Sequence, residues 1–78
     1  MMSIKDEYEK SKQWNVKVLL MNVFHIQRKV EDKKWRIRDT ANYFEVSMGL
    51  VSENLKLAKQ IKVLKKCSNR EEALRKIR

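Results

Sequence analysis

A chain of 78 residues that contains no proline and only one glycine has very few places where its backbone is predisposed to turn sharply. β-Hairpins and long loops depend on these two residue types, whereas helices are interrupted by proline and weakened by glycine. The composition therefore predicts an all-helical chain. Its length allows one small domain, residues 1–78, which we expect to contain about four helices.

The most strongly patterned stretch runs from Trp35 to Ala58, where apolar residues recur at helical spacing in two halves. The residues of the pattern are Ile37, Thr40, Ala41 and Phe44 in the first half and Leu50, Val51, Leu55 and Ala58 in the second. This spacing predicts two short helices, each with one buried face. Glu45 and Val46 are predicted to form a tight turn between them, and the Ser47 hydroxyl is suited to cap the second helix. We expect Trp35 to pack in the core at the entry to the first helix.

Two helices joined in this way resemble the helix-turn-helix of bacterial, plasmid and phage DNA-binding proteins, in particular that of partition and repressor proteins of the ParB and KorB kind. The residues that match their motif are Asp39, Thr40, Ala41, Phe44, Val46, Ser47, Val51, Ser52, Leu55, Leu57 and Ala58. The chain departs from the motif at two positions. Glu45 replaces the usual turn glycine, which predicts a left-handed backbone at a non-glycine residue. Arg36 replaces the usual Ser or Thr cap. The nucleotide-binding domain of ParB proteins has no counterpart in so short a chain.

The resemblance implies a module, residues 36–60, whose second helix enters the major groove of DNA with its N-terminal end first. The expected DNA-binding residues are Arg36, Arg38, Ser47, Met48, Gly49, Ser52, Glu53, Lys56, Lys59 and Lys62. Among them, Ser47 and the free N–H groups of the first turn would hold a phosphate. Met48 would contact a thymine methyl group and Glu53 would accept from cytosine N4. Lys56 and Lys59 would hold the DNA backbone.

The formal net charge of +9 is unevenly distributed along the chain. Residues 1–31 carry six basic and four acidic side chains, whereas residues 32–78 carry 13 basic and six acidic ones. Lysines at positions 56, 59, 62, 65 and 66 have no acid among them, and we expect at least two to contact phosphates. Ile61 and Leu64 keep the apolar period, so the pattern is compatible with a second helix that continues beyond residue 60.

The N-terminal segment, residues 1–32, is predicted to form either one long helix or two helices that break near Asn15. Ser3, followed three residues later by Asp6, has the pattern of a helix N-terminus. Between Val16 and Ile26, apolar residues occupy more than one face of the helix. Two explanations remain open, and both can hold. One is that this helix is the central element of the fold and is covered on two sides; the other is that part of it forms a homodimer contact.

The last segment, residues 68–78, is predicted to be a short basic helix. Ser68 and Glu71 have the spacing of a capping box at its start. Ala73, Leu74 and Ile77 would form its apolar side.

No set of residues suggests catalysis. His25, the only histidine, falls within an apolar helix, where we expect a core or interface residue. Cys67, the only cysteine, excludes an internal disulfide and a cysteine-cluster zinc site, and it favours a reducing compartment. Gly49 is the only glycine, so the chain has no glycine-rich phosphate loop. We therefore expect a protein that is not an enzyme and needs no metal or other cofactor.

No stretch has the roughly 18 apolar residues that a membrane span requires. The start of the chain also lacks the apolar core of a signal peptide. We therefore expect a cytoplasmic protein with no membrane partner.

Together these observations predict sequence-specific binding of double-stranded DNA, as in a small transcription regulator of phage, plasmid or bacterial origin that forms a homodimer or a higher homo-oligomer. Two alternatives remain open. The same module would serve as a DNA-recognition subunit for packaging or partition. A protein-interaction adaptor or inhibitor on a helix-turn-helix scaffold would instead bind a protein partner, and it would tolerate the loss of the lysines at 56–66. Structured RNA is less favoured, because no exposed aromatic platform is evident.

Overall fold

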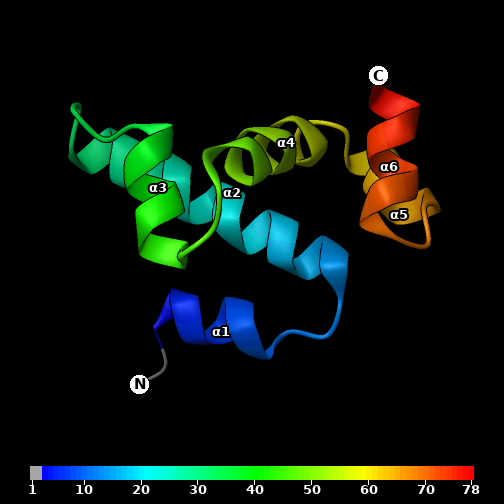
Figure 1. Ribbon diagram of the computed structural model, residues 1–78, viewed down its shortest axis with the longest axis horizontal. Coiled ribbons are helices and arrows are strands. Elements are labelled where there is room, and N and C mark those ends of the chain that lie inside the picture. Colours follow the sequence, from blue (N-terminus) through cyan, green and yellow to red (C-terminus); the bar gives the residue numbers. More distant parts are fainter. Residues whose placement is uncertain (1–2) are drawn as a thin grey trace.

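The computed structural model describes residues 3–78 as six helices joined by short connections (Figure 1). The helices are α1 (Ile4–Lys10), α2 (Trp14–Glu31), α3 (Ile37–Phe44), α4 (Met48–Ala58), α5 (Ile61–Lys66) and α6 (Arg70–Ile77). No strand occurs among the described residues, which confirms the all-helical prediction. The expected number of about four helices is wrong. The N-terminal segment divides into two helices, and α5 separates α4 from α6.

The N-terminal segment breaks at residues 11–13, slightly before the position near Asn15 that the sequence indicated. Ser3 caps α1, because its Oγ accepts a hydrogen bond of 3.2 Å from the backbone N–H of Asp6. After α1, the extended backbone of Ser11 and Gln13 reverses the chain, so that α1 lies along α2 (Figure 1). Residues 1 and 2 of the predicted segment lie outside the described residues.

α2 is the longest helix and contacts α1, α3 and α4. One side of it buries Val18, Met21 and His25. In Figure 1 it crosses the molecule diagonally, with α3 in front of its C-terminal half. Large aliphatic side chains on another side of α2 remain exposed. α2 is therefore the central helix of the fold, but it is covered on one side rather than on two.

A three-residue turn, residues 45–47, joins α3 to α4. Glu45 adopts a left-handed conformation with φ 57° and ψ 47°, as its position in the turn predicted. The N–H of Glu45 donates to the carbonyl of Asn42 at 3.3 Å, and the N–H of Val46 donates to the carbonyl of Ala41 at 3.0 Å. These two bonds form a Schellman motif, which satisfies the last carbonyls of α3 and stops the helix. The turn is therefore fixed by local backbone bonds.

The starts of α3 and α4 are capped in different ways. Ser47 Oγ accepts from the N–H of Leu50 at 3.1 Å, which confirms the predicted cap of α4. The Arg36 side chain has no acceptor to offer at the start of α3. There the carboxylate of Asp39 accepts from the Arg36 backbone N–H at 2.8 Å. One orphan N–H at the start of α3 is thus satisfied from within the helix.

The C-terminal third departs most from expectation. α4 ends at Ala58, because Gln60 leaves the helical path with φ −110° and ψ 64° before α5 begins. Asn69 caps α6, since its Oδ1 accepts from the N–H of Glu72 at 2.8 Å. The Glu72 carboxylate in turn accepts from the Ser68 N–H at 3.2 Å. The predicted capping box at residues 68–71 is therefore wrong by one residue, because asparagine caps a helix as well as serine does.

Two clusters of buried side chains form the core. The first lies among α2, α3 and α4 and comprises Met21, Ala41, Phe44 and Val51. Phe24 and Tyr43 stack beside it with ring centroids 4.2 Å apart. The second lies where α2 and α4 meet the C-terminal helices and comprises Val18, Leu57, Ala58, Leu64, Cys67, Ala73 and Leu74. The first cluster fixes α3 and α4 on α2, and the second fixes α5 and α6.

Candidate nucleic-acid interface

A hollow edged by basic side chains lies between the end of α2, the start of α3 and one side of α4. Its exposed basic residues are Lys29, Lys33, Lys34, Arg36 and Arg38. The one acidic residue in its lining, Asp39, already accepts a hydrogen bond from the Arg36 backbone. Met48 and Leu55 of α4 complete the apolar part of the lining. The fold therefore brings together Arg36, Arg38 and Met48 of the predicted site.

A buried polar cluster supports the corner that carries these cations. His25 Nδ1 lies 2.6 Å from Thr40 Oγ1, and the indole N–H of Trp35 donates to the same oxygen at 2.7 Å. Burial lowers the pKa of His25, and the nearby charge of Lys29 lowers it further. The imidazole is therefore neutral at pH 7, and its contact with Thr40 links α2 to α3. The expectation of a core histidine is confirmed, since His25 is 5% exposed.

Trp35 packs at the entry to α3, as the sequence predicted. Its ring meets that of Phe24 edge-to-face, with centroids 5.9 Å apart. The guanidinium of Arg28 lies 4.8 Å from the Trp35 ring centroid, which is a cation–π distance. These contacts hold the connection between α2 and α3, and with it the basic residues 33, 34, 36 and 38.

The first turn of α4 presents small and flexible residues to solvent. Met48 is 53% exposed, and Gly49 is exposed beside it. A Cβ added at Gly49 would meet only Ser47 Oγ, at 4.0 Å, which is an ordinary contact. The internal packing therefore does not require glycine at this position, although glycine costs about 1 kcal/mol relative to alanine in a helix interior.

The remaining predicted residues follow along α4 and beyond it. Ser52 is half-buried, whereas Lys56 and Lys59 are exposed and line a shallow groove with Ile77 of α6. Lys62 is exposed on α5. The five lysines from 56 to 66 therefore do not share one helix, because the chain turns between α4 and α5.

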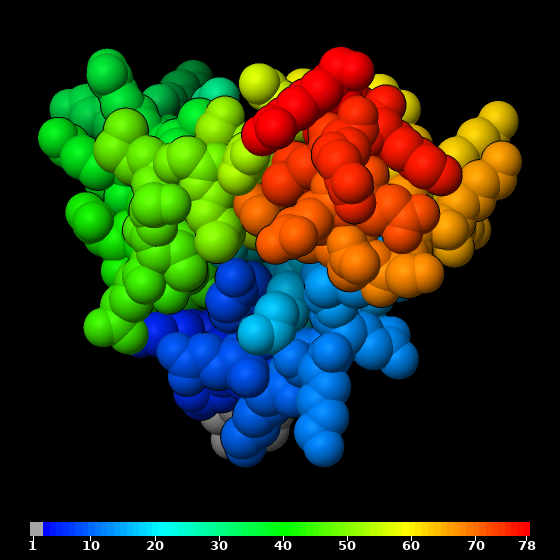
Figure 2. Space-filling view, turned by 45° about the vertical axis from the view of Figure 1, so that its right-hand side comes forward, coloured from blue at the N-terminus to red at the C-terminus, as the bar shows by residue number. Residues whose placement is uncertain are grey.

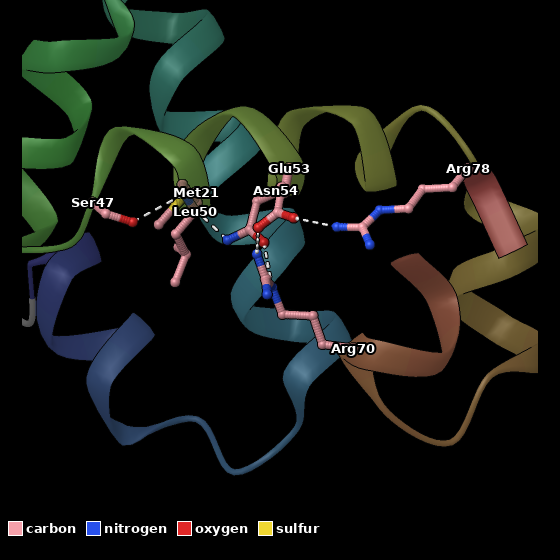
Figure 3. Close-up of polar contacts among 7 residues, drawn as sticks. All are labelled: Met21, Ser47, Leu50, Glu53, Asn54, Arg70 and Arg78. Carbon is pink, nitrogen blue, oxygen red and sulfur yellow. Dashed lines mark hydrogen bonds and ion pairs between the residues drawn. The ribbon is translucent and has the colours of Figure 1, made fainter. Parts of the chain in front are cut away.

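Glu53 belongs to a network that ties α6 to the side of α4 (Figure 3). Its carboxylate oxygens pair with Arg70 at 3.1 Å and with Arg78 at 3.4 Å. Arg70 Nε also donates to Asn54 Oδ1 at 2.9 Å, and Asn54 Nδ2 donates to the sulfur of Met21 at 3.3 Å. Figure 2 shows α6 against α4 on this face, above α1. The carboxylate that was expected to meet a base edge thus already has two arginine partners.

The chain matches no family model, no curated protein sequence and no solved structure. Its geometry and its sequence patterns therefore carry the functional argument.

The sequence patterns did not predict two members of the network between α4 and α6, Asn54 and Arg70. Asn54 is 2% exposed and lies at the spacing of Val51 and Ala58, both of which are buried. A polar residue at a buried helical position needs a partner, and this was the available signal for Asn54. Arg70 could not be found in this way, because the docking of α6 depends on contacts far apart in the sequence.

None of the helices within residues 3–78 has the length and apolarity needed to cross a bilayer. In the same range, no group of His, Cys, Asp and Glu side chains could hold a metal ion. What the described surface offers is a set of cations around the basic hollow and, at the C-terminal end of α4, Lys56 and Lys59. Arginine forks and lysine ammonium groups bind phosphate oxygens by charge-assisted hydrogen bonds.

Proposed function

We propose that this protein binds double-stranded DNA, with α3, the turn at 45–47 and α4 acting as a helix-turn-helix. The observation that carries this proposal is the basic hollow beside α4. Its lining contains five exposed basic side chains and one acidic side chain, Asp39, which already accepts a hydrogen bond from the Arg36 backbone. Such a surface suits a polyanion. The turn geometry at Glu45 and the Ser47 cap support the same assignment, as does the resemblance to partition and repressor proteins.

In this proposal the cations lie near both ends of α4 and hold the two edges of the major groove. Arg36 and Arg38 contact phosphates at one edge, and Lys56 and Lys59 contact phosphates at the other. α4 has 11 residues and is therefore about 16 Å long, compared with a major-groove width of about 12 Å. Its length is thus sufficient for cations at its two ends to reach both phosphate backbones.

Base contacts in this proposal come from Met48, Gly49 and Ser52. Met48 offers an exposed apolar side chain to a thymine methyl group, and the Ser52 hydroxyl can donate to a base edge or accept from one. Glu53 acts differently from a base reader: its ion pairs with Arg70 and Arg78 hold α6 on α4. Lys62 on α5 adds a further phosphate contact.

The biological role that fits this proposal best is transcription regulation of phage, plasmid or bacterial type. Packaging and partition subunits would use the same DNA contacts. If the protein shows no salt-dependent DNA binding, we expect instead an adaptor that binds a protein through the same scaffold.

A fluorescence-anisotropy titration with DNA selected from mixed genomic fragments tests the proposal. Affinity should fall steeply with salt, with a slope of log K against log [salt] of about −0.9 per phosphate contacted. The double variant Arg36→Gln/Arg38→Gln should lose about 10- to 30-fold in affinity and reduce that slope by nearly two.

The matched control is Lys12→Gln/Lys17→Gln, which changes the net charge equally, in the connection before α2 and in the first turn of α2. Its affinity should stay within about threefold of the parent, because a general charge effect is weak at physiological salt. Equal losses in the two double variants would contradict a site at the hollow. Absence of binding to every fragment would contradict DNA binding altogether.

Gly49→Ala separates binding from folding. The added methyl group has room within the protein, so the variant should be as stable as the parent or more stable, by up to about 1 kcal/mol. If Gly49 lies against DNA, the same methyl group should weaken specific binding by about tenfold or more. An unchanged affinity would show that Gly49 does not lie against DNA. The phosphate contacts are tested separately, by the salt titration.

A further inference from the structure

α2 carries a row of exposed aliphatic side chains that the rest of the molecule leaves uncovered. Its members, with their exposed fractions, are Val16 (36%), Leu19 (40%), Val23 (55%), Ile26 (52%) and Val30 (76%). Their separations alternate between three and four residues, which is the spacing of a seam between two paired helices. The row is about 21 Å long at 1.5 Å per residue.

The row lies nearly opposite the buried side of α2. At about 100° per residue, its centre is about 150° around the helix axis from Val18, Met21 and His25. Those three residues face the core, each 5% exposed or less. The helix therefore has two separate apolar sides, of which the fold of one chain uses one.

Charge is excluded from the row, although charged residues make up 37% of the chain. The charged residues of α2 are Lys17, Arg28, Lys29 and Glu31. Each is about 100° or more around the axis from the centre of the row. The immediate flanks include the neutral residues Asn22 and Gln27. A polyanion or an acidic peptide would find no cation in this row. The identical apolar row of a second copy would be complementary to it.

We infer that this row packs against the same row of a second copy, with the two α2 helices antiparallel and Val23 at the two-fold axis. The row is symmetric about Val23 in size, because Val16 would meet Val30 of the other copy and Leu19 would meet Ile26. An isologous contact of this kind is the commonest interface of soluble homodimers.

The helix dipoles favour the antiparallel orientation, because antiparallel helices place opposite ends of their dipoles together. Side-chain charge does not choose between the orientations, since Lys12 and Lys17 lie at the start of α2, as Lys29, Lys33 and Lys34 lie at its end.

The area involved indicates a weak dimer. The exposed fractions of the five residues correspond to roughly 400 Å² of apolar surface per copy, a size that is often functional on a small protein. Two copies would bury roughly 800 Å² from the row alone, and flanking residues bring the total near the lower limit of about 1,200 Å² for specific interfaces. We therefore expect a dissociation constant of the order of micromolar.

Sedimentation equilibrium over about 1–200 µM protein tests the pairing without DNA, so its result is independent of the proposed DNA binding. The parent should pass from 9.4 kDa to twice that mass. Val23→Glu should weaken association by at least about tenfold, since it buries two carboxylates at the axis. Ile61→Glu is the matched control, because Ile61 is also 55% exposed but lies on α5. It should dimerise like the parent.

Disulfide trapping tests the orientation. Under mild oxidation, Val23→Cys should form a covalent dimer, whereas the parent, whose Cys67 is buried, should not. Val16→Cys and Val30→Cys should cross-link when mixed but not separately. Cross-linking of either one alone would overturn the antiparallel arrangement.

A parent that stays monomeric throughout, with Val23→Glu indistinguishable from it, would overturn the dimer. Binding of that monomer to phosphatidylcholine vesicles would assign the row to a lipid surface instead.

Discussion

Glu45 holds a backbone conformation that suits glycine, and replacing it tests the account of the turn between α3 and α4. Its φ of 57° and ψ of 47° lie in the left-handed region. A side chain there costs about 1–2 kcal/mol, because its Cβ approaches the following carbonyl oxygen. Glycine avoids this cost but gives up about 0.4–1 kcal/mol through the greater entropy of the unfolded chain. The net gain expected from glycine over alanine is therefore about 0.5–1 kcal/mol.

The comparison must be made between Glu45→Gly and Glu45→Ala. The Glu45 carboxylate pairs with the Lys5 ammonium on the surface, and this pairing raises the pKa of Lys5 and lowers that of Glu45. Both variants lose the ion pair equally. The difference between them therefore isolates the backbone. Lys5→Gln reports the loss of the pair by itself.

Thermal and urea unfolding followed by circular dichroism measures the difference. For a chain of 78 residues, the net gain corresponds to a Tm of Glu45→Gly about 2–8 °C above that of Glu45→Ala. Equal Tm values, or a lower Tm for Glu45→Gly, would refute the argument that Glu45 stores backbone strain at the turn.

Three further predictions concern the core. Arg70→Met leaves the buried Oδ1 of Asn54 without its donor and should cost about 1–3 kcal/mol, whereas Arg75→Met, at an exposed site of the same helix, should stay within about 0.5 kcal/mol in urea unfolding. The folded-state pKa of His25 lies below its unfolded value of about 6.5, so the unfolded chain binds the proton first. The contribution of His25 to the free energy of unfolding should therefore be complete above about pH 6.5 and be lost as the pH drops through the folded pKa. His25→Gln should lack this part of the pH dependence. Parallel curves of unfolding free energy against pH for parent and variant would contradict the argument. Leu57→Ala empties a position with 0% exposure and should cost about 2–5 kcal/mol, and a loss below 1 kcal/mol would show that the second core cluster is loosely packed.

The sequence alone determined the local features of this protein. The helical spacing of residues 37–44 and 48–58, the Ser47 cap and the left-handed Glu45 all depend on groups no more than about five residues apart, because helix hydrogen bonds and caps are local. The break at residues 11–13 lies close to Asn15, where a break was one of two alternatives that the sequence left open. The turn after Ala58 was not predicted, because it carries no proline or glycine.

Only the tertiary structure decided which apolar side chains are buried and which cations gather. Val18 and Val23 are both valines of one helix, yet they are 1% and 55% exposed. No periodicity within α2 could say which side α4 would cover. Nor could any local pattern give Glu53 its partner Arg70, 17 residues away, or join the end of α2 to α4 around the basic hollow. These outcomes depend on how helices distant in the sequence pack together, and packing follows from the combined burial of all of them.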